Sequence, residues 1–198
     1  MACGVWRVIL REGVASVSVR SVAGEAALST GSLRHIFPGQ TELLVSALEL
    51  VQENVRDRIL ALPEALTGLA RAIAIAIARE LLPLDRERAV ELEVQLSLAA
   101  LAFSNPALRR VRDGADAAVL FACQRMLALI DHEYPLRNGV DPELEARLLH
   151  ALLDGLAAHL IQDSHLLTAV DALTILERHL SSLSTHDRTS APPTKEYQ

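Results

Sequence analysis

Residues 28–44 read LSTGSLRHIFPGQTELL, and this stretch decides the fold. Ser29 can cap a short helix, because serine accepts a hydrogen bond from a free backbone N–H of the first turn. Phe37 closes that helix, and Pro38 ends it, since the residue before a proline resists the helical conformation. A longer helix follows after Gly39. The stretch therefore predicts two helices that meet at a sharp corner.

The short helix has two distinct faces. Leu33, Ile36 and Phe37 recur at helical spacing and are expected to face inward. The polar and small residues fall on the other side, with Ser32 at the edge. These outward residues are Thr30, Gly31, Arg34 and His35.

A second capped helix precedes this one. Ser18 is its predicted cap, and Val17 and Val22 occupy the two positions of a hydrophobic staple. Leu28 and Leu33 repeat that staple for the next helix. Two short stapled helices joined by about three residues are the pattern of a helix-turn-helix.

The rest of the chain also predicts helices. Apolar residues make up 51% of the sequence and aromatic residues only 3%, so alanine and aliphatic residues dominate. The AIAIAIA segment at 72–78 alternates like a strand, but the three-to-four spacing of leucine and isoleucine around it favours a helix. We expect an all-α fold of about nine helices. Beyond the helix-turn-helix, the predicted helices cover residues 5–10, 40–58, 63–82, 85–103, 106–131, 142–162 and 168–183.

Three segments are expected along the chain. Residues 1–50 form a helix-turn-helix domain, and residues 51–183 form a helical ligand-binding and dimerisation domain. Residues 184–198 are polar, contain proline and are expected to be disordered.

Other classes of protein find little support. The sequence has no HExxH, P-loop, GxGxxG or GxSxG motif and no Glu-x-x-His pairs, so we predict no catalytic residue, metal or cofactor. Cys3 and Cys123 lie far apart and fit reduced thiols. No apolar run approaches the roughly 18 residues of a membrane span, and no secretory signal is evident. A soluble cytoplasmic protein is expected.

The first third of the chain resembles the DNA-binding domain of the TetR family of transcriptional regulators. The resemblance rests on the run GVASVSVRSVAGEAALSTGSLRHIFPGQTELL at residues 13–44. Its features are the helix stop at Gly13, the cap at Ser18, and the later Phe37-Pro38 and Leu43-Leu44 pairs. The remaining two thirds match that family only as an architecture.

Some positions depart from that family. Ala27 stands where glycine is usual, Arg34 replaces a common tyrosine, and Gln40 replaces a common lysine. No basic arm precedes the first helix. Residues 1–50 carry four arginines and four glutamates, and the whole chain has a net charge of −6. Fewer phosphate contacts imply weaker non-specific binding and a shallower salt dependence.

The resemblance implies DNA contacts for the residues around the short helix. Thr30, Ser32 and Arg34 are expected near base edges, and Gly31 would let the backbone approach closely. Phosphate contacts are expected from Ser18, Arg20, His35 and Gln40, with Ser29 completing the DNA-binding set. Taken singly, each also fits an ordinary solvated surface residue.

The resemblance further implies a homodimer and a small-molecule effector. The last two helices should form the dimer interface; burial of their apolar stripes inside a monomer is the competing explanation. The expected interface residues are Leu148, Ala151, Leu152, Gly155, Val170, Leu173, Leu176 and Leu180. The candidate ligand-binding residues are Glu91, Gln95, Phe121, Gln124, His150 and Asp154.

The predicted function is a ligand-responsive DNA-binding regulator. We expect a dimeric repressor that a small molecule releases from a near-palindromic, double-stranded DNA operator. A helical ligand-binding or interaction protein with weak or lost DNA binding is the alternative, and activation instead of repression also stays open. The sequence names neither the effector, the operator nor the regulated genes.

Overall fold

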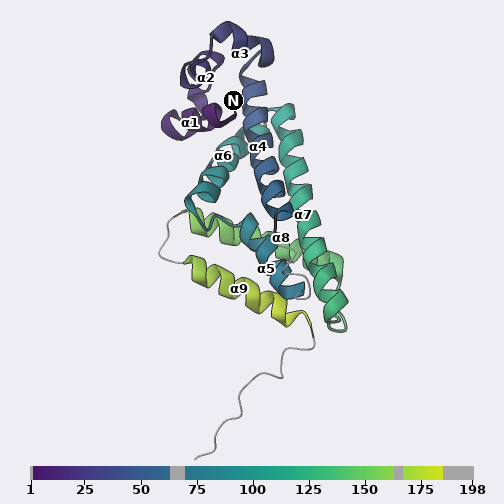
Figure 1. Cartoon of the computed structure of the whole chain (residues 1–198). Helices are drawn as coiled ribbons and strands as arrows, with labels where there is room; N and C mark the ends of the chain where they lie inside the picture. The colour runs from purple at the N-terminus through teal and green to yellow at the C-terminus, as the bar shows by residue number, and fades with distance from the viewer. Residues whose placement is uncertain (1, 63–69, 163–166, 185–198) are drawn as a thin grey trace, which may run out of the picture.

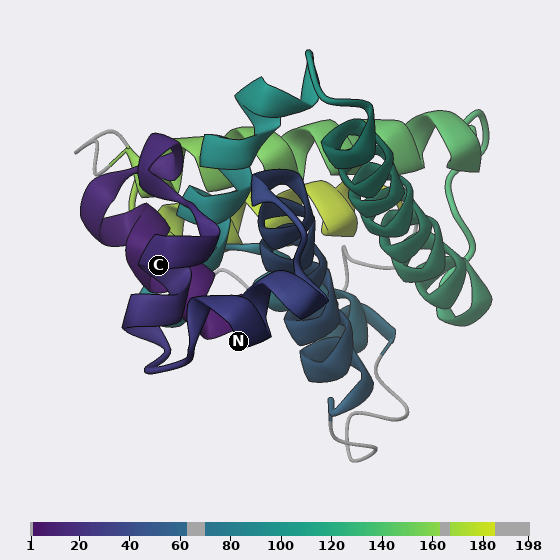
Figure 2. The ribbon, with the colours of Figure 1, turned by 90° about the horizontal axis from the view of Figure 1, so that it is seen from above.

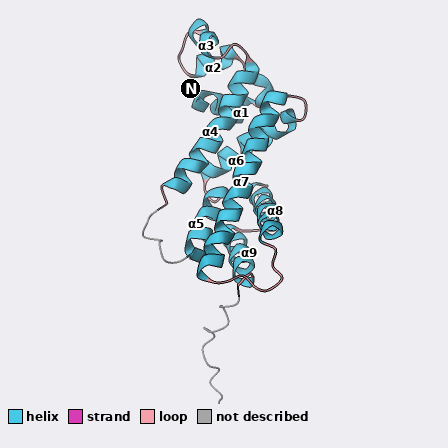
Figure 3. Cartoon of the chain, turned by 90° about the vertical axis from the view of Figure 1, so that its right-hand side faces the viewer, coloured by secondary structure: helices cyan, strands magenta, loops and turns pink. Residues whose placement is uncertain are grey.

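The computed structural model describes residues 2–62, 70–162 and 167–184. Within these ranges the chain forms nine α-helices, one short 3₁₀ turn and no extended strand (Figure 3), which confirms the all-α prediction. The elements are α1 Ala2–Glu12, η1 Val14–Ser16, α2 Val19–Glu25, α3 Thr30–Ile36, α4 Gln40–Leu60, α5 Ala70–Leu81, α6 Arg86–Ala102, α7 Pro106–Glu133, α8 Pro142–Ile161 and α9 Ala169–Ser182.

Most of the helices begin at a side-chain cap. In each case a side-chain oxygen accepts a hydrogen bond from a backbone N–H of the first turn, which satisfies a donor that the helix leaves free. The predicted caps Ser18 and Ser29 are confirmed in this way. The helices α6, α7, α8 and α9 are capped in the same manner by Asp85, Asn105, Asp141 and Thr168. The predicted start of the helix at residue 63 and residues 185–198 of the predicted disordered tail lie outside the described residues. For Ser184, the first residue of that tail, the prediction is wrong, because its side chain is buried against the second core.

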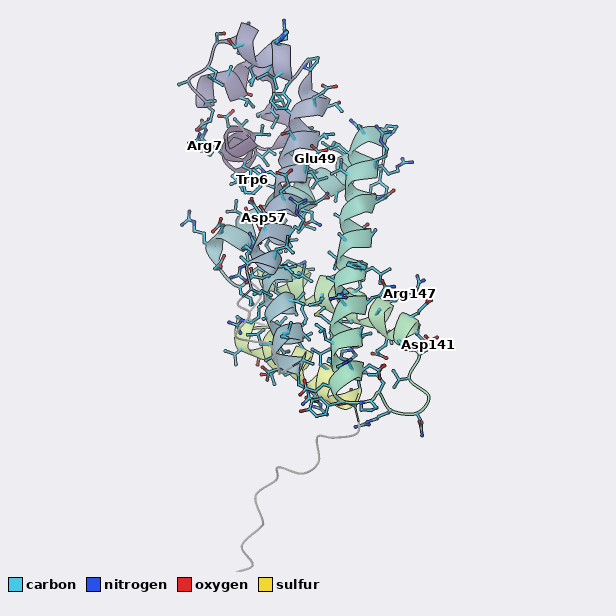
Figure 4. The ribbon with its side chains drawn as sticks, turned by 45° about the vertical axis from the view of Figure 1, so that its right-hand side comes forward. Trp6, Arg7, Glu49, Asp57, Asp141 and Arg147 are labelled. Atoms are coloured by element: carbon cyan, nitrogen blue, oxygen red, sulfur yellow. The ribbon has the colours of Figure 1, made fainter. Side chains whose placement is uncertain are left out.

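A first core lies at the N-terminal end of the molecule. Helix α1 packs against α2 and against the first half of α4 (Figure 1). Trp6 lies between α1 and α4 (Figure 4), and its Nε1 donates a hydrogen bond to the carbonyl oxygen of Ala47 at 3.0 Å. Four buried residues from outside the N-terminal region complete this core. They are Val94, Leu98, Ala102 and Leu108, from the end of α6 and the start of α7.

A second core lies at the other end, among α5, α7, α8 and α9. Alanine, leucine and isoleucine dominate it, and Cys123 and Met126 are fully buried there. The AIAIAIA segment forms part of α5, as the helical spacing predicts. Seen from above, α8 runs across the direction of α4 (Figure 2). No helix in the described part of the chain has the length and apolarity that a membrane crossing requires.

Helix α4 connects the two ends. Its first residues follow α3, and its last turns reach α5 and α6. The turn between α2 and α3 therefore lies at one tip of the molecule, and α9 lies at the opposite end (Figure 3). This arrangement holds α3 on the end of a long helix, away from the second core.

Candidate nucleic-acid interface

Helix α2 is fixed by a capping box. The Ser18 hydroxyl accepts from the backbone N–H of Ser21 at 3.1 Å, and the Ser21 hydroxyl accepts from the N–H of Ser18 at 2.9 Å. Val17 and Val22 are both buried, as a hydrophobic staple requires. These contacts fix the start of the helix and leave Arg20 exposed.

The turn between α2 and α3 is a Schellman turn with alanine in the position that usually takes glycine. The N–H of Leu28 donates to the carbonyl of Ala23 at 2.9 Å, and the N–H of Ala27 donates to that of Gly24 at 3.3 Å. Ala27 has φ 53°, a left-handed conformation that glycine adopts more easily than alanine. A side chain there costs about 1–2 kcal/mol.

Helix α3 is a two-turn helix with one fully buried anchor. The Ser29 hydroxyl accepts from the N–H of Ser32 at 3.0 Å, and the two hydroxyl oxygens lie 2.7 Å apart. Leu33 is buried, whereas Phe37 is half-buried. The prediction that Ile36 faces inward is wrong, because its side chain is 53% exposed. Helix α3 packs mainly on α2, and so short a contact reaches only one side of the helix.

The nine predicted DNA-binding residues share one property: each of them is exposed. Residues 30–35 of the set belong to α3, and Ser29 is the cap of that helix. Ser18 caps α2, Arg20 lies in the first turn of α2, and Gln40 is the first residue of α4. No side-chain hydrogen bond caps α4, so its first backbone N–H groups have no side-chain acceptor. The exposed set is Ser18, Arg20, Ser29, Thr30, Gly31, Ser32, Arg34, His35 and Gln40.

Ion pairs occupy half of the arginines in this region. Glu25 contacts Arg7 at 3.1 Å and Arg11 at 2.8 Å, and the hydrogen bond from Arg11 lowers the pKa of the Glu25 carboxyl. Among the described residues, Arg20 and Arg34 form no ion pair with a carboxylate. The positive charge available to a phosphate backbone in this region therefore comes from these two arginines, and from His35 when it is protonated.

The predicted ligand-binding residues lie in several places. Glu91 is buried and bound by Arg58, at 2.7 Å between Nη2 and Oε2. Gln95 is half-buried on α6, and Phe121 is 62% exposed on α7. Gln124 lines a small hollow between α7 and the start of α8, of about 180 Å³. These four residues share no described cavity.

His150 and Asp154 lie four residues apart on α8 and contact each other. The Nε2 and Oδ2 atoms lie 3.6 Å apart, and the Asp154 side chain is 71% exposed, which is typical of a weak surface ion pair. Nearby, burial raises the pKa of the Cys123 thiol to about 12, and the charge of Asp154 adds to this effect. Cys123 is therefore a protonated core residue with low reactivity.

A larger cavity, of about 600 Å³, lies between α5, the end of α7 and α9. Its apolar wall is one face of α5, and Arg71 lies 5.8 Å from the centre of the Tyr134 ring. The Arg71 Nη2 also donates to Ser184 Oγ at 3.2 Å. Sequence reasoning missed this cavity. Its one local signal is Arg71, a charged residue at the start of an alanine-rich and isoleucine-rich helix.

The predicted dimer residues divide into two groups. On α8, Leu148, Ala151 and Gly155 are exposed and Leu152 is half-buried, and their contact with a second copy stays a prediction. Leu144 extends this face with 56% exposure, and sequence reasoning missed it.

The predicted residues of α9 are not all accessible. Leu176 and Leu180 are fully buried within the chain, so the competing explanation, burial inside the monomer, holds for these two. Leu173 is half-buried in the second core. Val170 is 73% exposed but shares the face of α9 that carries Glu177, one of the residues lining the large cavity.

Within the part of the chain that the structure describes, no group of three or more His, Cys, Asp or Glu side chains could hold a metal ion. The arrangement at the N-terminal tip instead offers hydroxyls, a guanidinium, an imidazole and free helix N–H groups. These are the donors that contact bases and phosphates in protein–DNA complexes.

Comparisons with known proteins agree with this geometry. Residues 70–185 match the family model described as BetI-type transcriptional repressor, C-terminal. The chain is 34% identical over 192 residues to the HTH-type transcriptional regulator PksA of Bacillus subtilis (strain 168), covering 94% of this chain and 89% of that protein.

Solved structures show the same architecture. A transcriptional regulator from Rhodococcus sp. superposes with a TM-score of 0.76 at 25% identity, over 92% of each chain. A regulator from Saccharomonospora viridis, solved in complex with choline, gives a TM-score of 0.69 at 22% identity, over 91% of each chain. The second likeness is one of fold alone.

Proposed function

The chain belongs to the TetR family of transcriptional regulators, and on that premise we propose that it is a homodimeric repressor of a near-palindromic operator. The observation that carries this proposal is the exposed polar face of α3, opposite the buried Leu33. A face of this kind, projecting from the tip of the molecule, fits the major groove of DNA. The alternative of a protein that has lost DNA binding is not favoured.

In this proposal α3 is the recognition helix. Arg34 is the strongest base-reading candidate, because a guanidinium can bond the O6 and N7 atoms of guanine together. Thr30 and Ser32 supply shorter donors and acceptors, and Gly31 has no side chain to hold the backbone away. Ser32 also shares its hydroxyl with Ser29, so its orientation is already fixed before DNA binds.

Phosphate contacts flank the recognition helix. Ser18 and Arg20 approach from the start of α2, and His35 and Gln40 approach from the corner between α3 and α4. The uncapped N-terminus of α4 adds backbone N–H groups, which favour an anion. Since two arginines of this region already bind Glu25, we expect few counterions to be released and a shallow salt dependence.

The dimer is proposed to form through the exposed face of α8. Leu144, Leu148, Ala151 and Gly155 lie on one side of that helix, and the absent side chain of Gly155 allows a partner helix to approach closely. On α9 we propose Ile175, which is 40% exposed and lies one turn before His179, a residue that contacts Glu145 of α8. Two recognition helices about 34 Å apart would then meet successive turns of the major groove.

We propose the cavity between α5 and α9 as the effector site. Its volume of about 600 Å³ suits a small molecule, and its lining combines an apolar wall with Arg71, Glu133 and Tyr134. The six ligand-binding residues predicted from the sequence do not line this cavity and stay a separate prediction. For Glu91 the carboxylate is already bound by Arg58. A ligand that favours one arrangement of the dimer by about 5 kcal/mol would switch DNA binding.

The decisive test is selection of bound duplexes from a random DNA pool. We expect the full chain to select a near-palindromic sequence, and Arg34→Ala to weaken binding to it by about 5–150-fold, the usual value of a bidentate base contact. Arg125→Ala, which removes an exposed arginine from the distant part of α7, is the matched control and should bind as the unmodified protein does. Equal binding by the Arg34 and Arg125 variants would contradict the assignment.

A further inference from the structure

Between the two cores, polar and charged side chains hold the end of α4 against α5 and α6. Glu91 of α6 accepts hydrogen bonds from Arg58 Nη1 at 2.9 Å, Arg58 Nη2 at 2.7 Å and Asn54 Nδ2 at 2.9 Å. Arg58 Nε also donates to Glu80 of α5 at 3.0 Å, and Arg88 lies 3.3 Å from the same carboxylate oxygen of Glu80. We name these five residues, Asn54, Arg58, Glu80, Arg88 and Glu91, the junction network.

The apolar contacts of α4 weaken where this network begins. Val51 is the last fully buried apolar residue of the helix, and Val55 and Ile59 are only partly buried. Two residues before Asn54, Gln52 donates to the carbonyl of Val111 of α7 at 2.9 Å. The directional contacts of the last two turns are therefore those of Asn54 and Arg58.

The contact between Arg58 and Glu91 is geometrically strict. Glu91 is 3% exposed, and both of its carboxylate oxygens face the two terminal nitrogens of one guanidinium. A planar, two-point pair tolerates little rotation, unlike apolar side chains that can slide past each other. Buried pairs of this kind often add little stability compared with apolar replacements, but they can specify one arrangement.

A small change in the direction of α4 at the junction network becomes a large displacement of α3 at the DNA. Residues 40–58 of α4 span about 27 Å at 1.5 Å per residue. A tilt of about 5° around the network would move the N-terminus of α4, and α3 with it, by about 2 Å. In two subunits the displacements add to about 4 Å, which exceeds the 3.4 Å step between base pairs.

We propose that the junction network sets the direction of α4, so that Arg58 and Glu91 are positioning residues for the spacing between operator half-sites. This inference rests on the proposed dimeric operator binding.

The test compares operators that differ only in half-site spacing. The duplex selected by the unmodified protein is remade with its half-sites one base pair closer, and one and two base pairs farther apart. We expect the unmodified protein to lose at least about tenfold in affinity at each altered spacing, as misplaced base contacts do. The Arg58→Met/Glu91→Met variant leaves no unpaired buried charge. Its affinity should vary by less than about threefold across the series.

Two controls separate positioning from general damage. Arg112→Met/Asp113→Met removes an exposed ion pair of 2.6 Å from α7 and should keep the narrow spacing preference. Affinity for a duplex with a single half-site should be unchanged in the junction variant, because α3 is untouched. If the double variant fails to fold, Glu91→Gln, which keeps the size of the side chain, is judged by the same spacing series.

Failure of the proposed dimeric operator binding and failure of the positioning role give different results. If the unmodified protein selects no sequence with two half-sites, the proposed dimeric function fails. If it does select one, and the folded junction variant keeps the same narrow spacing preference, the positioning role of Arg58 and Glu91 is overturned. A broadened preference with unchanged half-site affinity supports that role.

Discussion

The two ends of the molecule place their functional residues by different means. Around the first core, caps and turns within a few residues fix α2 and α3, as in the hydrogen bonds of Ser18 with Ser21 and of Ser29 with Ser32. Toward the second core, the defining contacts join distant positions: Arg58 and Glu91 are 33 residues apart. Local signals therefore describe the N-terminal tip well, whereas the structure around the second core depends on how whole helices pack together.

The largest expected effect tests whether Leu33 alone holds α3 in the first core. Leu33→Ala should lower the free energy of unfolding by about 2–5 kcal/mol, because Leu33 is the fully buried residue of that helix. Ile36→Ala, at an exposed position of the same helix, should change it by less than about 0.5 kcal/mol. Urea unfolding followed through the fluorescence of Trp6, the single tryptophan, measures both. Similar losses in the two variants would contradict the single-anchor description of α3.

The next largest effect tests the burial of Cys123 in the second core, through the pH dependence of the free energy of unfolding. The pKa of Cys123 rises from 9.0 to about 12 in the folded chain, so the folded state keeps a proton that the unfolded state loses. This contribution to stability is complete below pH 9 and is lost as the pH rises toward 12, by about 1.4 kcal/mol per unit. Between pH 8 and pH 10, the free energy of unfolding measured in urea should therefore fall more in the unmodified protein than in Cys123→Ala. Equal losses would mean that the thiol is hydrated.

The smallest effect concerns the turn between α2 and α3. Ala27→Gly removes a left-handed strain of about 1–2 kcal/mol and adds about 0.5–1 kcal/mol of chain entropy to the unfolded state. The net gain of about 0.5–1 kcal/mol should raise the melting temperature by about 1–4 °C. Ala26→Gly is the control, since φ is −88° there and glycine should destabilise. A lower melting temperature for Ala27→Gly would show that the strain is relieved in another way.

Much of the fold could be predicted from the sequence because its signals are local. A cap, a proline at the first helical position and a break such as Pro38-Gly39 each act within a few residues. The spacing of apolar residues was also enough to recognise α5 as a helix despite its alternating pattern. The nine predicted DNA-binding residues are all exposed, and their contacts with DNA stay a prediction.

Periodicity could not show which neighbours each helix has. Ile36 fits the inward spacing of α3, yet α3 packs mainly on one helix and leaves that side chain in solvent. Leu176 and Leu180 fit an interface stripe, yet their own chain covers them completely. The partner of Glu91 and the wall of the large cavity both come from other helices. These features depend on tertiary packing, to which spacing along one segment is insensitive.

The composition of the first core has a consequence for how the protein unfolds. Val94, Leu98 and Leu108 of α6 and α7 are buried with residues of α1, α2 and α4, so no clean boundary separates this core at residue 50. Loss of α6 and α7 would expose one side of that core to water. We therefore expect a single cooperative transition, in which the N-terminal end unfolds together with the end that holds the second core, and a fragment of residues 1–50 that does not fold alone.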